Sequence, residues 1–287
     1  MANLTRRSLL KTSIAGVAAA SLSSPLSAEV QPTKRKGRVK QSVGRWCYKK
    51  FSLDELCEQS AKIGLQGIDL LQPDEYEIPK RYGLVCALGY AGAGDIPNAL
   101  NRTENHDAIE KALQLNIPRA AKASVPNVIT FSGNRKGMSD EEGLRNTITG
   151  LNRVKKIAED NGVVICLELL NSKVDHHDYM CDHTEWGLRV VQEVNSPNVR
   201  LLYDIYHMQI MEGDLIATIK PNIQWIAHFH TGGVPGRHEL DKTQEVQWDA
   251  VVSAVADTGY KGFIAHEFVP MRVPFTSLRE AADLCDV

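Results

Sequence analysis

The sequence contains no apolar run that reaches the roughly 20 residues needed to cross a bilayer as a helix. Neither sign of charge is in excess, because 33 Lys and Arg residues face 35 Asp and Glu residues. The formal net charge of −2 therefore supplies no basic field of the kind that attracts nucleic acid. Hydrophobic residues make up 43% of the chain and charged residues 24%, which is typical of a globular protein.

Motifs that would identify a nucleotide-binding fold or a zinc site are also missing. Neither GxGxxG nor GxxxxGK followed by Ser or Thr occurs after the first predicted strand, which argues against a phosphate-binding loop. No pair of cysteines has the CxxC spacing of a zinc or redox site. The six cysteines are Cys47, Cys57, Cys86, Cys166, Cys181 and Cys285. Several lie in apolar runs, so we expect buried thiols, although an oxidising compartment would also permit a disulfide.

The first 28 residues differ from the rest of the chain. Arg6 and Arg7 form a twin-arginine pair, the small and apolar stretch Ile14–Ser24 follows, and no acidic residue occurs before Glu29. This pattern predicts a twin-arginine export signal over residues 1–28. We therefore expect a periplasmic or otherwise exported protein, which folds before transport.

A polar basic linker is predicted over residues 29–40, and a single catalytic domain over residues 41–287. In this domain, apolar runs rich in β-branched residues alternate with amphipathic helical patterns. The predicted strands are Ser42–Tyr48, Gly67–Leu71, Leu84–Gly89, Asn127–Phe131, Val163–Leu169, Val199–Tyr206, Trp225–His230 and Gly262–Glu267. The predicted helices are Leu53–Ile63, Asp107–Leu115, Asp140–Asp160, Thr184–Val194, Asp214–Ile219 and Trp248–Thr258.

The repeated strand–helix units indicate parallel strands joined by helical crossovers. Ser52 and Ser139 each precede a predicted helix in the position of an N-cap. A doubly wound open sheet would show the same alternation, but a count of eight strands fits a closed barrel better. We therefore predict an α/β fold with a single (β/α)8 TIM barrel.

Four residues that could hold a metal ion lie at the carboxyl ends of the last four predicted strands: Glu168, Asp204, His230 and Glu267. In a barrel of this kind, these ends open onto one face, where active sites are built. Three carboxylates and one imidazole suit a divalent cation such as Mg²⁺ or Mn²⁺. A single buried glutamate would more often belong to an ion pair with a neighbouring strand. Four such residues on four neighbouring strands favour a metal site instead.

Other histidines surround these four residues in the sequence. Alternation along the strand places His228 on the same side as His230 but one layer deeper. His228 therefore either supports the metal ligand or is a hydrogen-bonded core histidine. His207 follows Asp204 by three residues, at a strand end leading into a loop, and is placed to approach a ligand bound to the metal.

The stretch 230–239, with the sequence HTGGVPGRHE, predicts a tight loop beyond a strand. This loop would carry Arg237 and Glu239 over the mouth of the barrel. Arg237 could bind an anionic or polyhydroxy substrate, or it could pair with Glu239 on the rim. The weaker candidates are Lys173, Asp175, His176, His177 and Asp178 as a polar loop or lid, and Trp46 and Tyr90 as pocket walls or ordinary packing residues.

The motifs CLELLNS, LLYDIYHMQIMEGD, HFHTGGVPGRHE and GYKGFIAHEFVP resemble those of the xylose isomerase-like barrels, which include sugar isomerases and ketose epimerases. The resemblance is nearest to the hydroxypyruvate isomerase group. It implies that Glu168, Asp204, His230 and Glu267 bind the metal. It also implies that the two glutamates are the acid/base pair and that His207 and Arg237 contact the substrate.

The resemblance implies a metal-dependent isomerase of the intramolecular oxidoreductase class. It would interconvert a small α-hydroxy ketone and aldehyde by moving a proton through an enediolate. The expected substrate is a small-molecule sugar or hydroxy-keto acid, and the protein could form a homo-oligomer. Ketose 3-epimerisation or keto-sugar dehydration on the same site are alternatives, as is an exported sugar-binding barrel without turnover. An endonuclease for abasic DNA would need more metal ligands and a basic rim.

Overall fold

The computed structural model describes residues 33–287, so the predicted export signal lies outside the described residues. Eight parallel strands pair in chain order and close on themselves, β8 pairing with β1. The strands are β1 (Lys40–Gly44), β2 (Gly67–Leu71), β3 (Val85–Tyr90), β4 (Asn127–Thr130), β5 (Val164–Glu168), β6 (Val199–Asp204), β7 (Ile226–Thr231) and β8 (Phe263–His266). The predicted TIM barrel is confirmed.

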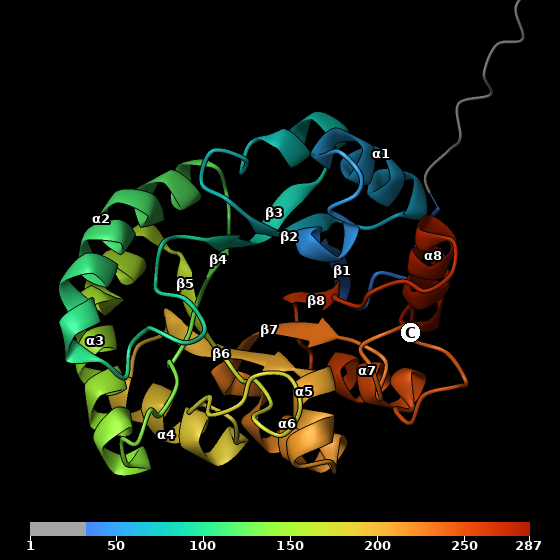
Figure 1. Cartoon of the computed structure of the whole chain (residues 1–287). Coiled ribbons are helices and arrows are strands. Elements are labelled where there is room, and N and C mark those ends of the chain that lie inside the picture. Colours follow the sequence, from blue (N-terminus) through green and yellow to red (C-terminus); the bar gives the residue numbers. More distant parts are fainter. Residues whose placement is uncertain (1–32) are drawn as a thin grey trace, which may run out of the picture. The chain divides into compact units, whose positions relative to one another are not determined.

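Helices form a ring outside the strands, and Figure 1 shows this ring around the barrel. They are α1 (Leu53–Ile63), α2 (His106–Lys122), α3 (Asp140–Asn161), α4 (Thr184–Val194), α5 (Ile205–Met211), α6 (Leu215–Asn222), α7 (Trp248–Asp257) and α8 (Pro274–Leu284). Between β2 and β3, a short 3-10 helix, Ile78–Tyr82, takes the place of an α-helix. The apolar faces of strands and helices form one buried core.

Two predicted strands are too long because helices begin inside them. The prediction for Ser42–Tyr48 was wrong in its second half, since residues Arg45–Tyr48 form a 3-10 helix after β1. The prediction for Val199–Tyr206 overran β6, which ends at Asp204. There the Asp204 carboxylate accepts a hydrogen bond from the backbone N–H of His207 and caps α5.

Helix boundaries were predicted best where a capping residue is present. Ser52 and Ser139 accept hydrogen bonds from backbone N–H groups in the first turns of α1 and α3, as the sequence predicted. Helix α2 runs beyond its predicted end and contains Pro118, because its buried stripe continues through Ile117 and Ala120. The short helix α5 and the last helix α8 were not predicted.

The segment before β1 packs on the barrel. Arg35 donates to the backbone oxygen of Ile63 in α1 and pairs with Asp283 in α8. All six cysteines are free thiols, and all except the half-buried Cys47 are buried. Within residues 33–287, no helix is both long and apolar enough to cross a membrane.

Candidate active site

The four candidate metal ligands meet at the carboxyl end of the barrel. Glu168 ends β5, Asp204 ends β6, His230 lies near the end of β7, and Glu267 directly follows β8. One ligand atom from each lies within 4.8 Å of every other, and all four residues are buried. Their meeting follows from strand register, since Asp204 pairs with His230 across β6 and β7.

His230 lies at the centre of this cluster. Its Nδ1 atom lies 2.7 Å from Glu267 Oε2, 3.4 Å from Glu168 Oε1 and 3.8 Å from Asp204 Oδ2. This buried nitrogen makes no hydrogen bond. Burial opposes the imidazolium form, but the charge of Glu267 and contacts with neighbouring carboxylates outweigh it and raise the pKa of His230 well above its ordinary value. The cluster therefore attracts a cation, whether a proton or a metal ion.

The donor set fits a divalent metal. Ligand atoms about 2.0–2.2 Å from a small ion lie roughly 3 Å from one another, and the distances around His230 Nδ1 bracket that value. Three carboxylates with one imidazole match the preferences of Mg²⁺, Mn²⁺ or Zn²⁺. Glu168, Asp204, His230 and Glu267 are thus the residues that would hold the ion.

Glu267 is held by neighbours on both carboxylate oxygens. The indole N–H of Trp46 donates to Oε1, and the Arg237 guanidinium donates to Oε2. Gly44 leaves room for this side chain, since a Cβ there would lie 3.0 Å from Glu267 Cγ. Burial alone would raise the pKa of Glu267, but the positive charges of His230 and Arg237 lower it well below its ordinary value. Glu267 is therefore an ionised, oriented carboxylate.

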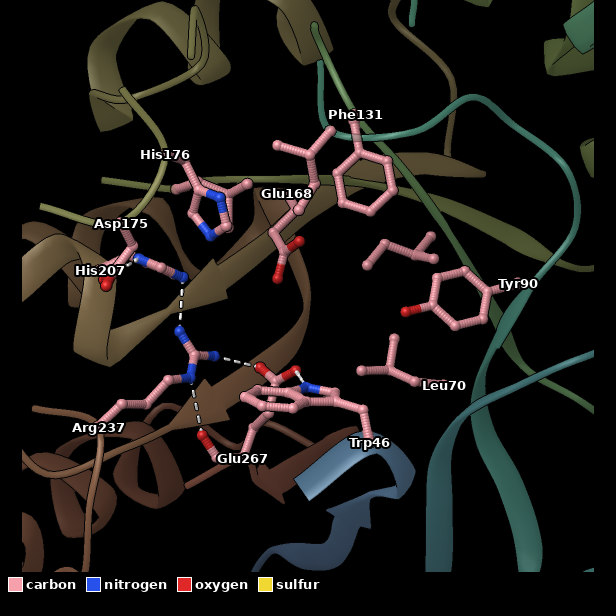
Figure 2. Close-up of a pocket in the computed structure, with 13 residues that line it drawn as sticks. Trp46, Leu70, Tyr90, Phe131, Glu168, Asp175, His176, His207, Arg237 and Glu267 are labelled. Atoms are coloured by element: carbon pink, nitrogen blue, oxygen red, sulfur yellow. Dashed lines mark hydrogen bonds and ion pairs between the residues drawn. The ribbon is translucent and has the colours of Figure 1, made fainter. Parts of the chain in front are cut away.

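Glu168 has a different environment. Among the described residues, no side chain donates a hydrogen bond to its carboxylate, which points into the cavity in Figure 2. Burial raises the pKa of Glu168 from 4.5 to about 7, although His230 acts in the opposite direction. A carboxyl group with such a pKa can both accept and release a proton near neutral pH.

Arg237 enters the cavity instead of lying on the rim. Its Nε donates to the backbone oxygen of Glu267 at 2.9 Å, and one terminal nitrogen contacts His207 Nε2 at 2.6 Å (Figure 2). The other terminal nitrogen contacts Asp204 Oδ2 at 2.6 Å. The alternative pairing with Glu239 is wrong. Glu239 accepts instead from Ser277 and from two backbone N–H groups of the loop after β8, so it stabilises that loop and does not reach over the mouth.

His207 lies beside Arg237 and is fully buried. Its Nδ1 lies 2.7 Å from Asn171 Nδ2. Burial, reinforced by the charge of Arg237, lowers the pKa of His207 well below its ordinary value, so the ring is neutral. Arg237 and His207 thus form a polar wall next to the four candidate metal ligands.

Residues of the loop after β5 divide between this wall and the surface. Asp175 and His176 line the cavity, and the His176 ring lies 5.3 Å from that of His207. Lys173 instead donates to the last carbonyl groups of α5, and His177 is exposed. Two members of the predicted polar loop therefore face the cavity.

The opposite wall of the cavity is apolar. The cavity has a volume of about 370 Å³ and includes Trp46 and Tyr90. The remaining apolar lining residues are Leu70, Ile96, Ile129, Phe131 and Leu170. Figure 2 shows Leu70, Tyr90 and Phe131 across the cavity from His207 and Arg237. A bound molecule would therefore meet hydrogen-bonding groups on one side and an apolar surface on the other.

Asp69, which no sequence motif predicted as a site residue, lies beneath the cluster. Asp69 Oδ2 lies 2.5 Å from His228 Nε2 and 3.5 Å from His230 Nε2, and all three side chains are fully buried. The signal available in the sequence was an acidic residue within the apolar strand GIDLL, β2. That position gave no indication of its partners, because β2 and β7 are not neighbours in the barrel.

A comparison of the sequence with known families agrees with this architecture. The profile of the xylose isomerase-like TIM barrel matches residues 57–285, which is most of the chain. The chain belongs to this family. The four clustered ligands and all the described cavity-lining residues except Trp46 therefore lie in the matched part of a xylose isomerase-like TIM barrel.

Curated relatives of this xylose isomerase-like chain include isomerases and an epimerase. Hydroxypyruvate isomerase of Escherichia coli K12 is 24% identical over 241 residues, which cover 77% of this chain and 90% of the relative. D-psicose 3-epimerase of Ruminiclostridium cellulolyticum is 32% identical over 130 residues, which cover 44% and 41% of the two chains. The match spans only 44% and 65% of the lengths of the human and mouse relatives.

Solved structures share the barrel. The AP endonuclease, family 2, of Brucella melitensis superposes with a TM-score of 0.76 at 22% identity, covering 84% of this chain and 96% of that one. A D-psicose 3-epimerase gives a TM-score of 0.66 at 17% identity, covering 85% and 95%. The IOLI protein with a bound zinc atom gives a TM-score of 0.63 at 18% identity, covering 86% of this chain and 95% of that one. At these identities, the likeness establishes the fold alone.

Proposed function

We propose that the protein is a divalent-metal-dependent isomerase or epimerase. It moves a proton on a carbon atom next to the carbonyl group of a small hydroxy ketone or aldehyde. The observation that carries this proposal is the convergence of Glu168 and Glu267 with Asp204 and His230 around one point at the cavity floor. A bound ion supplies polarisation of the substrate's carbonyl oxygen and stabilises the negative charge that develops on it. The names of the isomerase and epimerase relatives support this reaction class.

The two glutamates differ in how readily each can accept and release a proton. Both oxygens of Glu267 are engaged by Trp46 and Arg237, so taking up a proton would disrupt these contacts. Glu168 faces the cavity with only His230 Nδ1 near its carboxylate, at 3.4 Å, and in the metal-free protein burial raises its pKa to about 7. We assign Glu168 as the residue that removes the proton and Glu267 as the anchored partner that orients the substrate or returns the proton.

The charge of the cavity favours an uncharged substrate. Arg237 is the only Lys or Arg among its described lining residues, and Asp204 and Glu267 already neutralise it. The carboxylate of hydroxypyruvate would therefore find no unpaired cation other than the metal itself. The cavity volume of about 370 Å³ also leaves room for a molecule larger than a three-carbon acid. We therefore favour a ketose of about hexose size over hydroxypyruvate.

An endonuclease role fits the same cavity poorly. DNA binding requires several cationic contacts to phosphates, and the described cavity lining offers one arginine that is already paired. The likeness to an AP endonuclease structure, at 22% identity, establishes a shared barrel and no activity. The site geometry favours chemistry on a small molecule.

Proton exchange in D2O tests the proposed function. The protein loaded with Mg²⁺ or Mn²⁺ is incubated with a panel of ketoses and, separately, with hydroxypyruvate, and carbon-bound deuterium and new products are followed by NMR. We expect deuterium or product with at least one ketose. A product with an inverted centre identifies an epimerase, and an aldose or a shifted carbonyl identifies an isomerase.

The controls are Glu168→Gln and Glu267→Gln, which keep the shape of each side chain. Each is expected to reduce turnover by at least about 100-fold, the usual contribution of a positioned acid/base group. Absence of both deuterium and product across the panel, in a folded protein that binds the metal, would instead indicate a sugar-binding barrel. Turnover of hydroxypyruvate alone would overturn the preference for a ketose.

A further inference from the structure

Three buried polar side chains form a row that leads from the candidate metal ligands into the barrel interior. It consists of His230, Asp69 and His228, none of which has any exposed surface. His230 presents Nδ1 to the carboxylate cluster and Nε2 to Asp69, so its two ring nitrogens face different neighbours. A buried carboxylate among apolar strands is costly unless its charge is compensated, so this position calls for an explanation beyond packing.

The strand that carries Asp69, β2, is irregular at this position. The pairing of β2 with β3 shifts register on both sides of Asp69, and Leu70 has a positive φ of 64°. A branched L-residue rarely adopts this conformation, so the backbone is strained at this point. Asp69 lies beneath His230, and Leu70, at the irregular end of the strand, lies in the cavity wall.

The two carboxylate oxygens of Asp69 differ in their hydrogen-bond partners. Oδ2 receives His228 Nε2 at 2.5 Å, while His230 Nε2 lies 3.5 Å from the same oxygen. Oδ1 of Asp69 has no hydrogen-bond partner, and neither does either ring nitrogen of His230. A proton on His230 Nε2 would have Asp69 as its acceptor, whereas a proton on Nδ1 would occupy the position where the cation is held. The arrangement therefore favours the tautomer with the proton on Nε2.

We propose that Asp69 is a positioning residue for the metal site. It accepts the Nε2 proton of His230 and thereby keeps Nδ1 unprotonated and turned toward Glu168, Asp204 and Glu267. His228 donates to the other side of the same oxygen and holds the Asp69 carboxylate in place. A carboxylate behind a metal-binding histidine fixes its tautomer and strengthens it as a ligand. This inference rests on the metal site of the proposed function.

Metal affinity of an isosteric variant tests the role of Asp69. In Asp69→Asn, the amide can donate to His230 Nε2, which would move the ring proton to Nδ1 and obstruct the ligand position. We expect the Kd for Mn²⁺, measured by calorimetry and by electron paramagnetic resonance, to rise about 10–100-fold. The matched control is His106→Asn, which removes a buried histidine contact to the Leu100 carbonyl away from the site. This variant should lose stability but keep the wild-type Kd.

Nitrogen NMR of histidine-labelled protein gives a second readout that ordinary destabilisation does not change. In the wild-type protein loaded with Zn²⁺, His230 should carry its proton on Nε2, with Nδ1 bound to the metal. A proton on Nδ1 would overturn the proposal even if Asp69→Asn does not fold. So would a folded Asp69→Asn variant with the wild-type Kd. A second ion per chain that is lost in this variant would make Asp69 a ligand and also overturn the positioning role.

The two proposals fail in different ways. A wild-type protein that binds no Mn²⁺ contradicts the metal site and the role of Asp69 together. Normal Mn²⁺ binding that is insensitive to Asp69→Asn contradicts the role of Asp69 alone. Binding that depends on Asp69, without turnover of any ketose or of hydroxypyruvate, supports the positioning role and contradicts the proposed enzyme activity.

Discussion

Glu168 and Glu267 are chemically alike but lie in different surroundings within one cavity. Glu267 accepts hydrogen bonds from Trp46 and Arg237, and its pKa is lowered by the charges of His230 and Arg237 against the effect of burial. Glu168 accepts no side-chain hydrogen bond from the described residues, its contact with His230 Nδ1 is longer at 3.4 Å, and burial raises its pKa to about 7. Differences of this kind separate an anchored carboxylate from one that exchanges a proton. The division of roles between the two glutamates is therefore a property of their neighbours.

The raised pKa of Glu168 predicts a stability cost in the metal-free protein. The unfolded chain ionises near pH 4.5 but the folded protein only near 7, so folding is penalised increasingly across this interval and fully above it. At about 1.4 kcal/mol per pKa unit, the cost reaches a few kcal/mol. We expect metal-free Glu168→Gln to melt several degrees above wild type at pH 8, with the difference shrinking toward pH 4.5.

Thermal melts in the presence of a chelator measure this difference. The exposed Glu104→Gln substitution serves as the control and should leave the melting temperature unchanged at every pH. An unchanged or lower melting temperature of Glu168→Gln at pH 8 would show that the Glu168 carboxylate is not desolvated in the folded protein.

His230 predicts how metal binding depends on pH. Neighbouring carboxylates raise the pKa of His230 against the effect of burial, so a proton competes with the metal for Nδ1. We expect Mn²⁺ affinity to fall as the pH is lowered from 8 to 6, by about tenfold per unit for each proton displaced. Calorimetry in buffers of different ionisation enthalpy counts the released protons. A Kd that does not change over this range would contradict the assignment of His230 as a ligand.

At the scale of elements, the ends of helices and strands decide where side chains point. Asp204 ends β6 and caps α5 with one oxygen, while its other oxygen contacts Arg237. The cap explains why the predicted strand extends beyond the end of β6. The sequence after Asp204 begins with strand-forming residues, but with Asp204 as its N-cap it forms the helix Ile205–Met211. The carboxylate is thereby held at the cluster by the local backbone.

Capping also gives a prediction that concerns stability without activity. Ser139 Oγ accepts from the Glu142 N–H at 3.2 Å at the start of α3. Loss of this bond in Ser139→Ala should cost about 1 kcal/mol and lower the melting temperature by roughly 2–4 °C. Ser139→Asp retains an acceptor and should stay near wild type. Turnover and metal affinity should be the same in all three proteins, since α3 begins away from the cavity lining, and a change in either would reveal a coupling between α3 and the site.

At the scale of the whole molecule, barrel closure makes the site. Pairing of β8 with β1 brings Glu267 beside Gly44 and Trp46, which are more than 200 residues earlier in the chain. Arg35, in the segment before β1, forms an ion pair with Asp283 in α8, so it also connects the two ends of the barrel sequence. Residues from both ends of the barrel sequence thus complete one cavity.

We propose that the whole chain is exported through the twin-arginine pathway, on the basis of Arg6 and Arg7 before an apolar stretch. Fusing residues 1–40 to green fluorescent protein should place folded, fluorescent reporter in the periplasm of a host with this translocase. Replacing Arg6 and Arg7 together by lysine should retain it in the cytoplasm. Equal distribution of the two fusions after cell fractionation would contradict an export signal.

Much of the fold could be predicted from periodicity and caps. Helices α1 and α4 and strand β2 begin and end where the sequence predicts, because each is bounded by clear start or stop residues. The failures occurred at β1 and β6, where strand-like residues continue past the point at which the backbone turns into a helix. Single-sequence patterns do not register such turns, since residues that favour strands, such as Tyr48 after β1 and Ile205 after β6, continue past the end of the strand.

The sequence by itself determined that Glu168, Asp204, His230 and Glu267 lie at strand ends. In a closed barrel of eight parallel strands, all strand ends of one kind open on one face, so the strand count places the four residues on that face, and strand register then brings their side chains together. The tertiary structure alone decided that Arg237 turns inward to Asp204 and Glu267 and that Glu239 does not. It also decided that Asp69 stands under His230. These contacts depend on loop path, strand register and distances across the barrel, which no spacing along the chain encodes.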